Sequence, residues 1–84
     1  MTYETFGAPF VLDWCRGCHS AQLHPSMRQD APLSVNFDSL VEVRTHAARI
    51  RELAGATAQM PPRGGPSPEE RDLLVEWIDC GTPP

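Results

Sequence analysis

The sequence contains no lysine, and all seven of its basic residues are arginines. Eleven acidic residues outnumber them and give the chain a formal net charge of −4. Affinity for nucleic acid depends on basic side chains that neutralise phosphates, so we do not expect this chain to bind nucleic acid. No apolar run reaches the roughly 18 residues that a membrane-spanning helix needs, and we predict no membrane span.

The alternation of apolar and polar residues that marks a half-buried strand is also missing, and no segment is repeated. The chain has 84 residues, of which nine are proline and six are glycine. A chain of this length makes one domain, residues 1–84, whose small core usually needs a covalent or metal support. These features predict an all-α fold of about three main helices, with long loops around such a support.

One motif suggests what that support is. Cys15, Cys18 and His19 form the pattern C-x-x-C-H, which is the attachment signature of a c-type haem. Two intervening residues in a helical turn place both sulfurs on one edge of a flat macrocycle, and the next residue points toward its centre. The motif therefore predicts one haem c, bound through thioethers to Cys15 and Cys18, with His19 as the proximal iron ligand.

Two other readings of the motif remain open. A zinc site could combine Cys15, Cys18 and His19 with Cys80, although the adjacent residues 18 and 19 are awkward ligands for one tetrahedron. A C-x-x-C pair could also exchange thiols and disulfides, but such sites are typical of a βαβ context, which this sequence lacks.

The first predicted helix covers residues 2–15, with Thr2 as N-cap and an aromatic stripe along one face. Pro9 lacks an N–H, so the helix is expected to kink or to begin only there. Gly7 is either a weak point in the helix or a position where another helix approaches the backbone closely.

Two further helices are predicted, over residues 38–54 and 68–80. The first has Asp38 or Ser39 as cap and should end at Gly55, and Ser67 begins the second. Residues 20–37 and 55–66 lack a regular pattern. The last helix has an apolar face on which Cys80 also falls, so we predict a largely buried, unpaired thiol rather than a disulfide-linked dimer. That face consists of Leu73, Leu74, Trp77 and Ile78.

A second iron ligand should come from a loop. Met60 precedes a proline in a segment rich in glycine and proline, and it belongs to no helical stripe. A full predicted helix separates it from His19, so a loop can carry it across the haem, and we predict Met60 as the second ligand. The other candidates are His46, His24, Met27 and Met1.

Two irregular segments are expected to support the haem. A main-chain carbonyl in the stretch Ala31-Pro32-Leu33 could accept the Nδ1–H of His19, which would direct Nε2 toward the iron. Arg28 or Arg63 could bind a haem propionate, because a guanidinium matches a carboxylate bidentately.

Taken together, these motifs resemble the class I cytochromes c, and the resemblance covers nearly the whole chain. Pro32 lies where that family has a proline whose carbonyl bonds the proximal histidine, and Met60-Pro61 is similar to its methionine loop. Trp77 lies where the family has an aromatic residue packed on the first helix, near Gly7 and Phe10. The first and last helices are expected to pack on each other and on the haem, so Trp77 is predicted to contact the haem. The chain departs from the family in its missing lysines and its extra cysteine, Cys80.

The resemblance implies a small cytochrome c fold and a one-electron carrier that is not an enzyme, because two axial ligands leave no open position for substrate. Its partner would be a redox protein or a neighbouring domain, and the carrier would be a monomer. Haem is attached outside the cytoplasm, so the chain is expected in the periplasm or another extracytoplasmic compartment, after loss of a leader or as part of a longer chain. The alternatives are the haem domain of a larger secreted enzyme, and a haem sensor or enzyme with a labile distal ligand.

Overall fold

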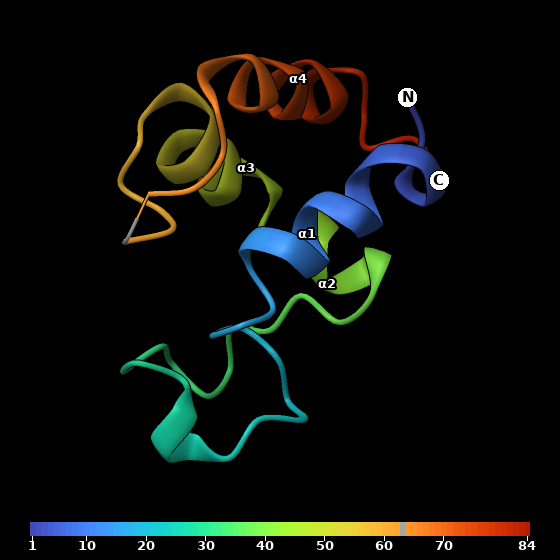
Figure 1. Ribbon diagram of the computed structural model, residues 1–84. Coiled ribbons are helices and arrows are strands. Elements are labelled where there is room, and N and C mark those ends of the chain that lie inside the picture. Colours follow the sequence, from blue (N-terminus) through green and yellow to red (C-terminus); the bar gives the residue numbers. More distant parts are fainter. Residues whose placement is uncertain (63) are drawn as a thin grey trace.

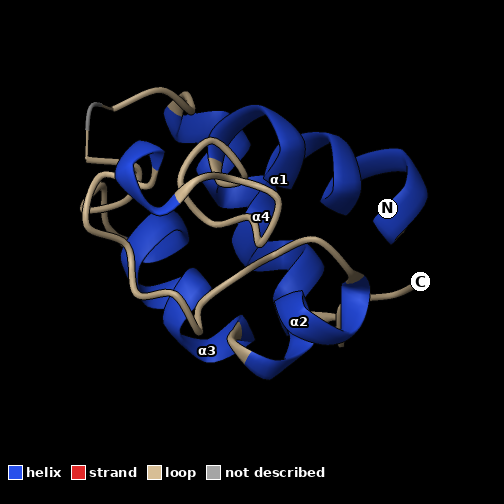
Figure 2. Cartoon of the chain, turned by 90° about the horizontal axis from the view of Figure 1, so that it is seen from below, coloured by secondary structure: helices blue, strands red, loops and turns tan. Residues whose placement is uncertain are grey.

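A computed structural model describes residues 1–62 and 64–84, and in these ranges the chain forms helices and loops without a strand (Figures 1 and 2). The prediction of an all-α chain is confirmed at this level. In the same residues, no helix is both long enough and apolar enough to cross a membrane. The helical elements are Tyr3–Gly7, α1 (Ala8–Trp14), a short turn at Pro25–Met27, α2 (Leu40–Thr45), α3 (Ala47–Ile50), Arg51–Ala56 and α4 (Pro68–Asp79).

The first helix runs without a break from Tyr3 to Trp14, although Pro9 lies inside it. Thr2 begins it as predicted, because its hydroxyl accepts a hydrogen bond from the Thr5 N–H at 3.1 Å. The turn before Pro9 is wider than an α-turn, and Gly7 N–H bonds the carbonyl of Thr2, five residues back. A proline normally clashes with the carbonyl four residues earlier, and the widened turn lets the helix continue past it.

The middle helix begins where it was predicted but ends later. The Ser39 hydroxyl caps it by accepting a hydrogen bond from the Glu42 N–H at 3.3 Å. His46 separates α2 from α3, and the helical path then continues through Gly55 to Ala56. The prediction that Gly55 ends the helix is wrong. Gly55 instead permits close packing, since a Cβ added there would lie 2.6 Å from a methyl carbon of Val75 on α4.

The last helix has the predicted start. The Ser67 hydroxyl accepts from the Glu70 N–H, and the Glu70 carboxylate accepts from the Ser67 N–H. Gly81 follows the helix with φ +92°, the left-handed conformation of a glycine after a helix end. One predicted member of the apolar face is wrong: Leu73 is 40 % exposed, whereas Leu74 is buried.

The prediction that Cys80 is largely buried is also wrong, because its side chain is exposed. Helical geometry ends at Asp79, and Cys80 is the C-cap, with ψ near 4°. Its N–H still bonds the Glu76 carbonyl, so Cys80 lies on the same side of the helix as Leu73, seven residues earlier, and that side is open to solvent, since Leu73 is 40 % exposed.

The core forms where the first helix crosses α4. Trp77 is fully buried, and a Cβ added at Gly7 would lie 2.6 Å from its ring. The rings of Tyr3 and Phe6 lie 6.3 and 6.1 Å from that of Trp77, within the range of favourable aromatic contact. The close-approach interpretation of Gly7 is thus confirmed. Phe10, Trp14, Leu74 and Ile78 belong to the same apolar cluster.

The C-terminal tail connects three elements. The Pro83 carbonyl accepts from the Tyr3 N–H at 2.7 Å and from Trp77 Nε1 at 3.2 Å. Arg44 of α2 donates to the Thr82 carbonyl at 2.8 Å. The two chain ends therefore lie close together beside the start of the first helix, while residues 17–37 extend away from the helices as one long loop (Figure 1).

Candidate functional site

A cavity of about 380 Å³ lies between the C-x-x-C-H motif, the long loop and the middle helix. Cys15, Cys18 and His19 line one part of it, and residues 28–32 with Val35 and Phe37 line another. His46 and residues 49, 50, 53 and 54 supply the helical wall, and residues 60–62 complete it. Segments far apart in the sequence thus meet around one space.

The motif itself forms a tight turn at the end of α1. The N–H groups of Cys18 and His19 donate to the Cys15 carbonyl at 3.2 and 2.9 Å. This turn places the two cysteines and the histidine in the wall of the same cavity. Burial, and secondarily the neighbouring Cys18, raise the pKa of the Cys15 thiol to about 12. Thiol–disulfide enzymes need the opposite shift, so this environment does not suit thiol exchange.

His19 is held in one orientation. Its Nδ1 donates to the Val35 carbonyl at 3.0 Å, which leaves Nε2 as the nitrogen for a metal. The predicted acceptor, in the stretch 31–33, is therefore wrong by at least two residues. The main chain of His19 is also fixed, since its carbonyl accepts from the Phe37 N–H at 2.9 Å, and the two rings lie 4.8 Å apart.

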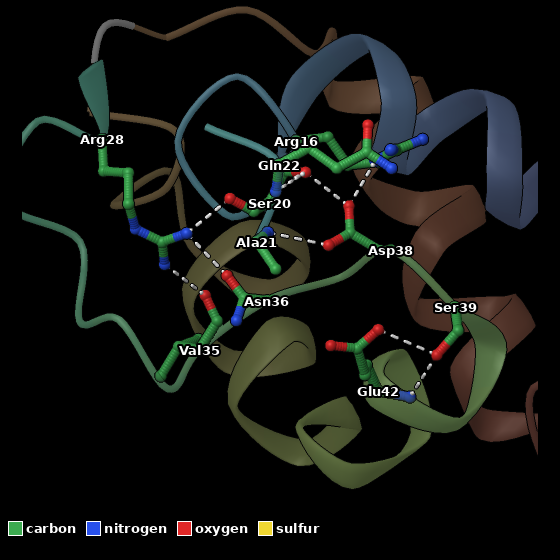
Figure 3. A network of polar contacts seen from close by, with 10 residues as sticks. All are labelled: Arg16, Ser20, Ala21, Gln22, Arg28, Val35, Asn36, Asp38, Ser39 and Glu42. Atoms are coloured by element: carbon green, nitrogen blue, oxygen red, sulfur yellow. Dashed lines mark hydrogen bonds and ion pairs between the residues drawn. The ribbon is translucent and has the colours of Figure 1, made fainter. Parts of the chain in front are cut away.

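Arg28 explains why the acceptor differs. It is 2 % exposed, and its Nη2 donates to the Pro32 carbonyl at 2.7 Å, the group expected to serve His19. Nη2 also donates to Val35, and Nη1 donates to the Ser20 carbonyl and to Asn36 (Figure 3). These bonds fold the long loop around one guanidinium. Pro32 and Arg28 both line the cavity.

One N–H group of the Arg28 guanidinium has no partner among the described residues. That group, Nε, is buried. An unpaired buried donor of a charged group is costly. Nε is closed to solvent although Arg28 lines the cavity, so the contact of Arg28 with a propionate stays a prediction. Arg63, the other predicted propionate ligand, lies outside the described residues.

Asp38 supports the motif from the other side. Its carboxylate accepts from Arg16 Nε at 2.9 Å, Ser20 Oγ at 2.6 Å and the Ala21 N–H at 2.8 Å (Figure 3). Burial opposes ionisation of this carboxyl, but the three hydrogen bonds and the Arg16 charge outweigh it and lower its pKa. Asp38 thus joins a residue inside C-x-x-C-H to the two residues after it.

Ser20 connects these two groups of contacts. Its carbonyl accepts from Arg28, and its hydroxyl donates to Asp38, so a continuous polar chain runs from Arg28 to Arg16 (Figure 3). The sequence pattern predicts only a helix-capping role for Asp38. Ser39 performs that role, which leaves the neighbouring carboxylate free to reach back to the motif.

Met60 lies in the wall of the cavity, 39 % exposed, and its N–H donates to the Leu53 carbonyl at 2.8 Å. His46 also lines the cavity, with its ring 5.7 Å from that of Phe37. The other candidate ligands, His24, Met27 and Met1, are not in the cavity wall, and neither is Trp77, which was predicted near the haem. Trp77 packs on the first helix instead.

The zinc site considered from the sequence does not form among the residues that the structure describes. No group of three or more His, Cys, Asp or Glu side chains there is arranged to hold a metal ion. Cys80, the fourth ligand of that hypothesis, is exposed at the end of α4 and does not line the cavity.

Comparisons of the chain with protein-family models, with curated proteins and with solved structures gave no match. What this chain does must therefore be inferred from its own residues and from the cavity that they surround.

Proposed function

We propose that this chain is a small cytochrome c of the class I type, which binds one haem c and carries single electrons. One observation supports this most strongly: the two cysteines and the histidine of C-x-x-C-H line the same cavity as Met60. Cys15 and Cys18 would hold the haem through thioethers. His19 would be the proximal ligand, and Met60 the distal one.

The residues of the cavity wall fit a haem. The wall contains apolar side chains suited to a flat macrocycle, among them Val35, Ile50 and Leu53. Arg28 also lines the cavity and would supply a positive charge to a propionate. The Nδ1–H of His19 is held by Val35, as expected of a metal-binding imidazole whose second nitrogen faces the metal.

When bound, a haem supplies an Fe(III)/Fe(II) couple. Met60 would favour the ferrous state, because a thioether is a weak donor, and the apolar wall would disfavour the additional charge of the ferric state. Val35 and Phe37 fix the ring and the main chain of His19, so its position should be the same in both oxidation states. With both axial positions filled, the protein would not act as an enzyme at the iron.

Its partner would be a redox protein or a neighbouring domain that meets a monomer of this chain through a small, weak interface. The site would be loaded outside the cytoplasm, in the periplasm or a comparable compartment, because covalent haem attachment belongs there.

The exposure of Met60 in the cavity wall favours a second function. Met60 is 39 % exposed, and His46 lines the same cavity. A methionine that leaves easily would open the iron, as in a haem sensor or the haem domain of an enzyme. Ready binding of CO to the ferrous protein, or a high-spin ferric spectrum, would support this alternative.

Absorption spectra and potentiometry of the loaded protein test the carrier. The wild-type protein is expected to be low-spin in both redox states, with the weak long-wavelength band of methionine on ferric iron. Met60→Ala should remove that band, lower the potential, and make the haem high-spin or recruit His46. His24→Ala, outside the cavity wall, is the matched control and should change neither quantity. An unchanged spectrum and potential in Met60→Ala would refute the ligand assignment.

A further inference from the structure

Arg71 is a buried arginine on the apolar side of α4, one turn before Leu74. It is 8 % exposed, and its Nη1 donates to three main-chain carbonyls. These belong to Ala54 at 2.7 Å, Met60 at 2.8 Å and Thr57 at 3.3 Å. All three acceptors lie in residues 54–60, the segment that joins the end of the middle helix to the methionine.

Few other hydrogen bonds hold this segment in the part of the chain that the structure describes. The last carbonyls of a helix lack partners within it, and Arg71 supplies one for Ala54. Thr57 Oγ donates back to the Glu52 carbonyl at 2.9 Å. The N–H of Met60 is bonded to Leu53, so Arg71 fixes the remaining polar group of the Met60 main chain.

Close packing makes this contact geometrically feasible. The middle helix packs extensively on α4, and Gly55 leaves room for Val75, whose methyl carbon would lie 2.6 Å from any Cβ at position 55. Arg71 precedes Val75 by one helical turn. The guanidinium of Arg71 therefore lies against the segment that leads to Met60.

We propose that Arg71 is a positioning residue for Met60: by holding the carbonyl of Met60 and two carbonyls before it, Arg71 keeps the thioether in the cavity wall and limits how readily it leaves the iron. The inference rests on the proposed ligation by His19 and Met60. Without Arg71, the segment would lose three hydrogen bonds to a charged donor, and the methionine would gain conformational freedom that favours its dissociation.

Imidazole binding to the ferric holoprotein measures this effect, because imidazole must displace the methionine. Arg71→Gln is expected to bind imidazole about ten- to a hundredfold more tightly than wild type, the range that loss of strong buried hydrogen bonds implies. Arg71→Gln should also weaken the long-wavelength absorption band of methionine on ferric iron. Arg71→Lys keeps a charged donor and should shift the affinity by only about three- to tenfold, and it serves as the test if Arg71→Gln does not fold.

Two controls separate positioning from general destabilisation. Arg44→Gln removes a comparable arginine contact, to the Thr82 carbonyl and hydroxyl at 2.8 and 3.0 Å, in a segment outside the cavity wall. It should lower the free energy of unfolding but leave imidazole affinity within about twofold of wild type. In a Met60→Ala background, Arg71→Lys should likewise change the affinity by less than about twofold.

The proposal is overturned if the Arg71 variants bind imidazole as wild type does, or if they tighten binding equally when Met60 is absent. Failure of the ligand assignment itself looks different. In that case wild type already binds imidazole as tightly as Met60→Ala does, before any Arg71 variant is compared.

Discussion

The position of His19 depends on two charged side chains outside the C-x-x-C-H pattern. Arg28 gathers carbonyls of the long loop, including Val35, which accepts from His19. Asp38 accepts hydrogen bonds from Arg16, which precedes His19, and from Ala21, which follows it. Neither interaction involves the ligand atom itself. Both fix the main chain from which the imidazole projects, so a change at either residue should alter the position of His19.

Asp38→Asn tests this support. The pKa of Asp38 is lowered from 3.8 in the folded chain, so its ionised form adds stability above about pH 4 that is lost as the pH falls through the lower folded value. We expect the variant to be less stable than wild type by about 1 kcal/mol at pH 7, and by less at pH 3. Urea unfolding at both pH values measures the difference. Asp13→Asn, at an exposed position of α1, is the control.

A constant difference between Asp38→Asn and wild type at the two pH values would contradict the ionised, hydrogen-bonded state of this carboxylate. So would an equal response in Asp13→Asn, because that carboxylate makes none of the contacts described for Asp38.

Cys80 should be reactive in the native protein. Its side chain is exposed, while Cys15 and Cys18 would be consumed by thioethers. A maleimide reagent is expected to label one thiol per chain rapidly without denaturant, and Cys80→Ser should abolish the labelling. Under non-reducing conditions an exposed thiol also tends to form a disulfide between chains. Labelling that requires denaturant would contradict the exposed position.

At the level of elements, the helix starts could be predicted because they are local. Thr2, Ser39 and Ser67 each bond a main-chain N–H three residues ahead, a pattern visible in the sequence. The end of the middle helix could not be predicted, because Gly55 is used for contact with α4 rather than as a stop. The period that places Cys80 and Leu73 on an apolar face also says nothing about where a helix ends or which residues reach its neighbour.

The contact between the first helix and α4 should dominate the stability of the fold. Trp77 is fully buried against Gly7, so Trp77→Ala is expected to lower the free energy of unfolding by about 3–5 kcal/mol. Leu73→Ala, on the exposed side of the same helix, should cost less than about 0.5 kcal/mol. Chemical denaturation of the loaded protein measures both. Similar losses in the two variants would contradict the described packing.

For the whole molecule, the sequence predicts which residues line the cavity more reliably than how they are held there. Cys15, Cys18, His19 and Met60 were identified from spacing and context, and all four line one cavity. The contacts of Val35, Asp38 and Arg71 with this site were not foreseen, because they connect residues that lie near each other only after folding. The sequence does show that Arg71 is unusual, because it is a charged residue on the same side of the helix as Leu74 and Trp77. Its hydrogen-bond partners could not be inferred from that position.

The cavity also bears on how so short a chain is stabilised. An 84-residue chain with nine prolines has few side chains to fill its centre, and a space of about 380 Å³ remains among the helices and loops. A covalently bound haem would fill such a space with a large apolar surface and connect the first helix to the long loop. The haem would then be part of the core as well as the redox group.

Intact mass under denaturing conditions tests the central claim most directly. The chain is expressed with a leader in a host that attaches haem to C-x-x-C-H proteins, alongside a known c-type cytochrome. We predict the mass of the chain plus one haem, and of the chain alone when Cys15 and Cys18 are both changed to alanine, whereas Cys80→Ser should retain the haem. An unmodified wild-type chain from a host that loads the known cytochrome would contradict the account.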